Sequence, residues 1–104
     1  MKHLEEYDNH LDFIRDNPEY AVIPSDTVRS LWGYIRHRWM PGGFLGAVLS
    51  NNLGSAVGNA DNQNAHSLPE LVRLIYNFTP SNCHALSSSS ENNIVGKWLE
   101  GPST

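Results

Sequence analysis

The chain has 104 residues, of which 39% are hydrophobic, and a formal net charge of -4 at pH 7. This length is typical of one domain, which removes roughly 60–65% of its unfolded surface from water and so builds a single core. The acidic balance argues against binding of duplex nucleic acid, because contact with phosphates requires a basic surface.

Cys83 is the single cysteine, so no disulfide can form within the chain. The apolar runs are far shorter than the roughly 20 residues that a membrane span requires, and the N-terminus is too charged for a signal peptide. We therefore expect a cytoplasmic protein without a membrane partner.

The first 20 residues carry the whole net charge, because they hold two basic and six acidic side chains and the remainder is balanced. Apolar residues recur here at helical spacing, at Leu4, Tyr7, Leu11 and Ile14. Asn17-Pro18 should end the helix, since a residue before proline is disfavoured in the α region. We expect residues 1–20 to form an acidic helix and residues 21–104 to form a single helical domain.

The segment from Ser25 to Trp39 predicts a second helix with one apolar face. The residues expected on this face are Val28, Leu31, Trp32, Ile35 and Trp39. The opposite side carries Arg29, Arg36 and Arg38, and this is the one basic patch in the sequence. The arginines near its end either stabilise the helix dipole or form an anion site, and both interpretations stay open.

Residues 41–64 combine five glycines and five asparagines with apolar residues at helical spacing. Two short helices, over residues 44–49 and 53–60, are predicted, with a break or cap at Asn51-Asn52. Each interior glycine costs about 1 kcal/mol relative to alanine, which favours close approach of another helix, a second subunit or a ligand. Asparagines that are buried and converge would indicate a pocket for a polar ligand.

A further helix is predicted after Ser67, because Ser67 and Glu70 have the spacing of a capping box and Pro69 lies in the first turn. Thr79-Pro80 should end this helix. The residues expected to be buried on it are Leu71, Leu74, Ile75 and Phe78.

A polar, serine-rich loop near residues 84–92 and a last short helix over residues 94–99, docked through Trp98, complete the chain. No alternating strand pattern is present. The sequence therefore predicts an all-α fold, a compact bundle of four to six short helices that assembles into a homo-oligomer.

Motifs for catalysis or metal binding are absent from the sequence. The five histidines have no partner at i,i+4, and HExxH, CxxC and GxSxG patterns do not occur. We expect neither an enzyme nor a bound metal or cofactor, and interpret the lone Cys83 as a small core residue.

Residues 23–99 resemble a group of small bacteriophage and prophage proteins of about this length. The residues that carry the resemblance are Ile23-Pro24, Tyr34-Ile35, Pro41-Gly42, Phe44-Leu45, Ala47-Val48-Leu49, Asn52-Leu53, Ala56, Ala60-Asp61, Asn64, Leu68, Val72, Tyr76-Asn77, Pro80, Cys83 and Trp98. The pattern is densest over residues 41–64. The family has a glycine shortly after the cysteine, where this chain has Ala85-Leu86.

The resemblance implies a protein that acts against host functions in the cytoplasm of the infected cell. One expectation is a counter-defence sponge, an oligomer that sequesters a cyclic nucleotide or related phosphorylated signal of host immunity. The alternative is an inhibitor that binds a host defence protein through the acidic N-terminal helix, as anti-CRISPR proteins do. A third is a structural accessory protein of the phage, with the glycine-rich helix as its subunit interface.

For a nucleotide ligand, arginines would pair with phosphates, amides and a carboxylate would read base edges or ribose hydroxyls, and aromatic rings would stack on the base. The candidate ligand-binding residues are Arg36, Arg38, Trp39, Phe44, Asn51, Asn52, Asp61, Asn64 and Tyr76.

Overall fold

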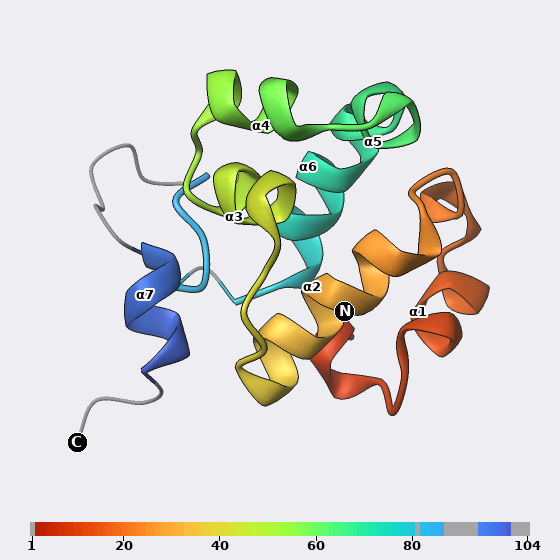
Figure 1. Cartoon of the computed structure of the whole chain (residues 1–104). Coiled ribbons are helices and arrows are strands. Elements are labelled where there is room, and N and C mark those ends of the chain that lie inside the picture. Colours follow the sequence, from red (N-terminus) through yellow and green to blue (C-terminus); the bar gives the residue numbers. More distant parts are fainter. Residues whose placement is uncertain (1, 81, 87–93, 101–104) are drawn as a thin grey trace.

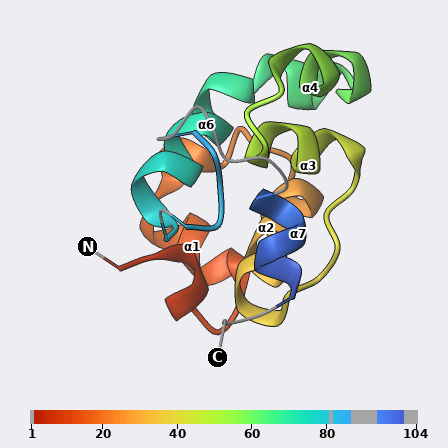
Figure 2. The same cartoon turned by 90° about the vertical axis from the view of Figure 1, so that its left-hand side faces the viewer.

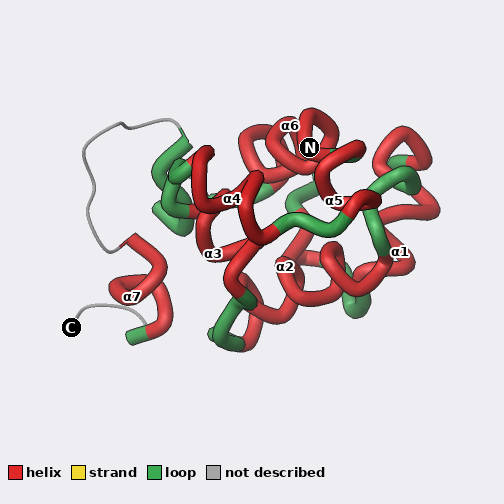
Figure 3. Tube along the Cα trace, turned by 45° about the horizontal axis from the view of Figure 1, so that its top comes forward, coloured by secondary structure: helices red, strands yellow, loops and turns green. Residues whose placement is uncertain are grey.

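The computed structural model describes residues 2–80, 82–86 and 94–100 of the chain. Over these residues the secondary structure is entirely helical, which confirms the all-α prediction (Figures 1 and 3). In chain order the elements are η1 (Leu4–Glu6), α1 (His10–Asp16), η2 (Pro18–Tyr20), α2 (Ser25–His37), α3 (Gly43–Leu49), α4 (Leu53–Asn59), α5 (Asn62–His66), α6 (Leu68–Phe78) and α7 (Ile94–Leu99), where η denotes a 3₁₀ helix. The described residues thus form seven α-helices rather than the four to six expected.

The prediction of one continuous N-terminal helix is wrong. The side chain of Asn9 accepts hydrogen bonds from the backbone N–H groups of Leu11 and Asp12, at 2.9 and 3.1 Å. This N-cap starts α1 at His10 and separates it from η1. The interruption shifts the helical phase, so Phe13 is fully buried and Leu11, expected inside, is 56% exposed.

The N-terminal segment shares one aromatic cluster with α6. Phe13 meets Tyr7 and Phe78 edge to face, with ring centroids 5.5 and 5.2 Å apart, and stacks on Tyr20 at 6.0 Å. Edge-to-face and stacked pairs of this kind add to the stabilisation that burial provides. Residues 1–20 therefore belong to the common core and are neither a single helix nor a separate layer.

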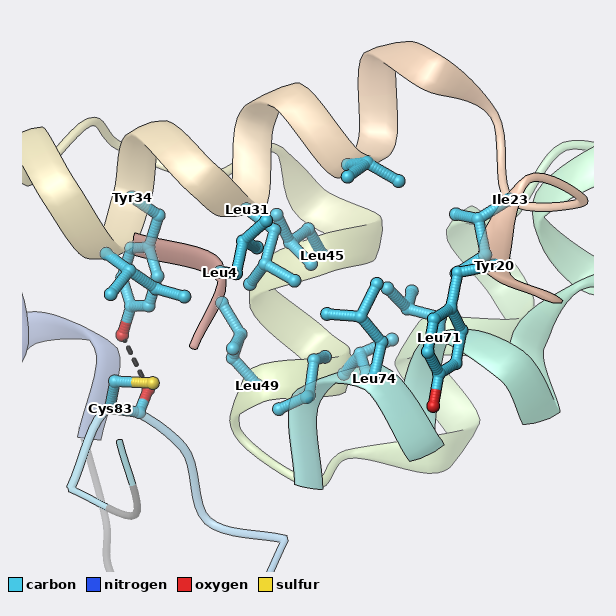
Figure 4. Close-up of a cluster of buried hydrophobic side chains, with 14 of the residues drawn as sticks. Leu4, Tyr20, Ile23, Leu31, Tyr34, Leu45, Leu49, Leu71, Leu74 and Cys83 are labelled. Atoms are coloured by element: carbon cyan, nitrogen blue, oxygen red, sulfur yellow. Dashed lines mark hydrogen bonds between the residues drawn. The ribbon is translucent and has the colours of Figure 1, made fainter. Parts of the chain in front are cut away.

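The centre of the core lies between α2, α3 and α6, as the labelled side chains of Leu31, Leu45 and Leu74 show (Figure 4). On α6, the predicted burial of Leu71, Leu74 and Ile75 is confirmed, and Phe78 is partly buried.

The start of α6 differs from the predicted capping box. Ser67 donates its hydroxyl hydrogen bond to the carbonyl of Gln63, at 2.9 Å, and Glu70 pairs with Arg73 at 3.0 Å. The reason is that α5 precedes α6 with only Ser67 between them, so Ser67 bonds back to α5 instead of capping forward. Pro69 lies in the first turn as expected.

Helices α4 and α5 lie over α3 and α6 as an outer layer (Figures 1 and 3). The predicted break is confirmed, since Asn51 has a φ of 57° and the Asn52 side chain caps α4 by accepting from the N–H of Ser55. A methyl group placed on Gly54 or Gly58 would meet nothing within 4 Å. Within this chain, these two glycines therefore do not serve the close packing that the sequence suggested.

The C-terminal helix α7 lies against the end of α2 (Figure 2). Trp98 docks it, as predicted, by donating its indole hydrogen bond to the carbonyl of Tyr34 at 2.9 Å. The Tyr34 hydroxyl in turn donates to the carbonyl of Cys83 at 2.8 Å, inside the core (Figure 4). His84 and Ala85, expected in a polar loop, are buried and Leu86 is partly buried, whereas residues 87–92 of that loop lie outside the described residues. No helix in the described part of the chain is long and apolar enough to cross a membrane.

Replacing Tyr34 by phenylalanine tests the Tyr34–Cys83 hydrogen bond. Tyr34→Phe leaves the buried Cys83 carbonyl without its donor and should cost about 1–3 kcal/mol of unfolding free energy. For a domain of this size, each 1 kcal/mol lowers the melting temperature by roughly 4–8 °C, measurable by calorimetry. Tyr76→Phe is the control, because Tyr76 is 58% exposed. Equal melting temperatures for both variants would contradict the assignment.

Candidate functional site

The basic end of α2 turns sharply at Arg38. This residue adopts the left-handed conformation, with φ 59° and ψ 35°, and the N–H of Trp39 donates to the carbonyl of Gly33 at 3.2 Å. The helix therefore stops at His37, and Trp39 does not continue the apolar face that the sequence predicted. The chain then reverses its direction and runs from the end of α2 to the start of α3 (Figure 1).

Trp39 lies across Gly33. A Cβ on Gly33 would approach the indole carbon Cε3 to 1.8 Å, so only glycine leaves room for the ring. His37 stacks on the same ring, with centroids 5.5 Å apart, and the guanidinium carbon of Arg29 lies 5.2 Å from its centroid. Trp32 meets Trp39 edge to face at 5.9 Å. Despite these contacts Trp39 remains 40% exposed, so it presents a fixed aromatic surface to solvent.

The other two arginines of the basic patch are engaged within the chain. Arg36 donates to the carbonyl of Tyr7, which also accepts from the indole of Trp32, and lies 3.8 Å from Asp8. Arg38 donates to the carbonyl of Ile35 and lies over Trp98, with the guanidinium carbon 3.7 Å from the ring centroid. Both arginines hold termini of the chain against α2.

A polar hollow of about 310 Å³ opens beside the reversed segment, and we call it the α2–α3 hollow. Its lining residues are Asp26, Thr27, Ser30, Gly42, Gly43, Phe44, Leu45, Asn59 and Asn64. Ser30 lies one helical turn from Gly33, about 4.5 Å along the axis of α2. Four residues from Trp39 to Gly43 span at most about 14 Å, which limits how far the hollow can lie from the exposed indole.

Among the predicted site residues, the structure brings Phe44 and Asn64 into the hollow, whereas Trp39 lies outside its lining and packs on Gly33 of α2. Asn52 and Asp61 instead cap helices, since their side chains accept from the backbone N–H groups of Ser55 and Asn64.

Asn51 lies on the far side of α3, in a small gap of about 30 Å³ under α4. Tyr76 is exposed on α6, outside the residues that line the hollow.

Sequence reasoning missed three polar residues of α2, namely Asp26, Thr27 and Ser30, and left Asn59 out of the site. It named Arg36 and Arg38, but not Arg29, among the candidate ligand-binding residues. A signal was present in the helical spacing, because Asp26, Ser30 and Gly33 lie three or four apart and share a face of α2.

A second hollow, of about 600 Å³, lies on the other side of α5. It is lined by residues 21–25 and by Asn62, Gln63 and His66, and so includes none of the predicted site residues. We place the candidate site at the smaller hollow because it adjoins an ordered aromatic ring and a guanidinium group.

The buried titratable groups lie away from this surface. Burial raises the pKa of the Cys83 thiol to about 11, so at neutral pH it is a thiol and a poor nucleophile. Burial lowers the pKa of His84. Its Nδ1 accepts from the N–H of Leu86, so the proton sits on Nε2, which is buried and has no hydrogen-bond partner among the described residues. No group of three or more potential metal ligands is found among the described residues.

Comparisons of the chain with protein-family models, with curated proteins and with solved structures found no match.

The packing of Trp39 against Gly33 can be tested with two glycine variants. Gly33→Ala should displace the indole and cost about 1–3 kcal/mol, because the added methyl overlaps the ring. Gly58→Ala, on the open face of α4, should instead stabilise the protein by about 0.5–1 kcal/mol. Chemical denaturation gives both values, and tryptophan fluorescence reports the displacement. A Gly33→Ala protein with unchanged stability and fluorescence emission would contradict the packing of Trp39 against Gly33.

The lowered pKa of His84 predicts an acid-sensitive fold. The unfolded chain protonates His84 near pH 6.5, whereas the folded chain resists protonation. The free energy of unfolding should therefore fall as the pH drops from 7 to 5. His84→Asn removes this contribution, so its unfolding free energy should vary less with pH across the same range. Parallel pH profiles for the two proteins would show that His84 does not contribute.

Proposed function

We propose that the protein is a non-enzymatic binding protein for a small phosphorylated nucleotide, which it holds on the surface formed by Trp39, His37, Arg29 and the α2–α3 hollow. The observation that carries this proposal is the indole of Trp39, seated on Gly33 and still 40% exposed beside a guanidinium group. An exposed tryptophan is costly to leave in water unless another surface covers it, and a nucleobase is a flat surface of matching size.

The residues around Trp39 suit the three parts of a nucleotide. A base stacked on an aromatic side chain gains about 1–3 kcal/mol, and an arginine beside the ring strengthens this through cation–π contact. Arg29 forms no ion pair with a carboxylate within the described residues, so its guanidinium can pair with a phosphate. The polar hollow next to it offers hydroxyls and amides to the remainder of the ligand.

The biological setting is part of the same proposal. Because residues 23–99 resemble small phage proteins, we propose that the nucleotide is a signal of host immunity and that the protein sequesters it in the cytoplasm of the infected cell. We further propose a homo-oligomer. Support comes from the outer face of α4, where Val57 is 58% exposed between Gly54 and Gly58, whose surroundings are open enough for a second chain.

A second candidate function is inhibition of a host defence protein through the acidic N-terminal region. The observation that favours it is Leu11, which is 56% exposed on α1 next to the acidic Asp12. An apolar side chain within an acidic surface is suited to a partner with a basic, partly apolar face.

Isothermal titration calorimetry with AMP, GMP, their 3′,5′-cyclic forms and cyclic di-GMP tests the nucleotide proposal. We expect at least one to bind. Trp39→Ala should weaken its affinity about ten-fold or more through lost stacking, and Trp39→Phe should retain part of it. Arg29→Ala should weaken binding of the phosphorylated ligand more than that of its nucleoside, because the nucleoside loses only the cation–π contribution.

Tyr76→Ala is the matched control, since it removes an exposed aromatic ring outside the hollow. Native mass spectrometry of the same samples reports the number of subunits and of bound ligands. Absence of heat with every nucleotide, or Trp39→Ala binding as tightly as the wild type, would refute the proposal and favour the inhibitor.

A further inference from the structure

Hydrogen bonds within the chain fix the orientation of two amides in the α2–α3 hollow. The Thr27 hydroxyl donates to Oδ1 of Asn64 at 2.7 Å, so the Asn64 amide nitrogen, for which the described residues provide no acceptor, can donate to a ligand. The Asn59 amide nitrogen donates to the carbonyl of Ser55 at 2.8 Å. Asn59 therefore turns its Oδ1 towards Gly43, where it is the atom nearest to a Cβ built on that glycine, at 3.3 Å. Asn64 therefore offers a hydrogen-bond donor to the hollow, and Asn59 offers an acceptor.

Acceptors dominate the rest of the hollow. Asp26 and Ser30 lie four residues apart on one face of α2 and contribute a carboxylate and a hydroxyl. Asp26 is exposed and forms no ion pair within the described part of the chain. No arginine or lysine lines the hollow. A phosphate would be repelled by this carboxylate, whereas a ligand rich in hydroxyl donors would satisfy it.

The order of residues along α2 indicates which part of a nucleotide reaches the hollow. Ser30 lies about 4.5 Å along the axis of α2 from the glycine on which the indole rests, and Asp26 lies about 6 Å further. The sugar is joined directly to the base, so it is the part of a nucleotide that comes next along α2 when the base stacks on Trp39. Arg29 directly precedes Ser30 on α2, and its guanidinium carbon lies close to the ring of Trp39. It is therefore the cation available to the phosphate. Base, sugar and phosphate thereby meet an aromatic ring, a carboxylate and a guanidinium group respectively.

We propose that the α2–α3 hollow is a ribose site, in which the Asp26 carboxylate accepts a hydrogen bond from the 2′-hydroxyl and Ser30, Asn59 and Asn64 contact the rest of the sugar. This inference rests on the proposed nucleotide-binding function and makes it more specific. Asp26 is then the residue that distinguishes ribonucleotides from deoxyribonucleotides. Asp26 makes this distinction by accepting a hydrogen bond from the 2′-hydroxyl, which deoxyribose lacks.

The test compares AMP with 2′-deoxy-AMP, and GMP with 2′-deoxy-GMP, by calorimetry on the full chain. Wild-type protein should bind the ribonucleotide about ten-fold more tightly, as expected for a hydrogen bond to a charged acceptor. Asp26→Ala should weaken the ribonucleotide to the level of the deoxyribonucleotide and leave the deoxyribonucleotide affinity unchanged. A merely structural role of Asp26 would weaken both ligands alike. Glu19→Ala, which removes an exposed carboxylate from η2, is the matched control and should keep the ten-fold preference.

The outcomes separate this inference from the proposed function. If no nucleotide binds, both are refuted. If ribose and deoxyribose forms bind equally to the wild type, nucleotide binding stands and the ribose site is refuted. If the preference for ribose persists in Asp26→Ala, the assignment of the hydroxyl acceptor to Asp26 is refuted.

Discussion

The contact between Trp39 and Gly33 determines how the rest of the candidate site is arranged. Because the indole occupies the space where a Cβ of residue 33 would lie, the chain after α2 is held along the outer face of that helix. The left-handed conformation of Arg38 makes this reversal possible, at a backbone position that side chains other than glycine and asparagine rarely adopt. The path of the reversed segment then brings Gly42 and Gly43 beside Ser30, which forms the α2–α3 hollow. A single glycine inside α2 thus links the aromatic surface to the polar one.

The three arginines of the basic patch on α2 differ in what they contact. Arg36 and Arg38 hold the N-terminal segment and α7 to the centre of the molecule, through the carbonyl of Tyr7 and the ring of Trp98. The helix dipole favours cations at this position, so their charge stabilises the fold without a ligand. Arg29, eight residues before the helix ends, has Trp39 as its neighbour. In the proposed function, this division leaves Arg29 as the cation for a phosphate.

Much of the fold follows from helical spacing, and much of the site does not. Burial along α6 and the cap at Asn52 were predictable, because each depends on residues close together in sequence. The docking of Trp98 was predictable as the burial of a large aromatic side chain, but its partner Tyr34 lies 64 residues away and was not. The split of the N-terminal helix depends on Asn9 bonding to N–H groups ahead of it, a choice that competes with helix continuation and leaves little trace in the apolar pattern. The position of Trp39 depends on a left-handed Arg38, to which the sequence gives no signal. The hollow depends on contacts between Thr27 and Asn64, 37 residues apart, which periodicity cannot reveal.

The three tryptophans allow one direct measurement of the central claim. The indole N–H groups of Trp32 and Trp98 donate to backbone carbonyls of Tyr7 and Tyr34, whereas Trp39 is the exposed ring. In ¹⁵N-labelled protein each indole gives a separate NMR signal, which can be followed while the tightest-binding nucleotide is added. We predict that the Trp39 signal shifts in proportion to occupancy while those of Trp32 and Trp98 stay in place. A titration in which the Trp39 signal does not move, or in which the other two move instead, would contradict the account.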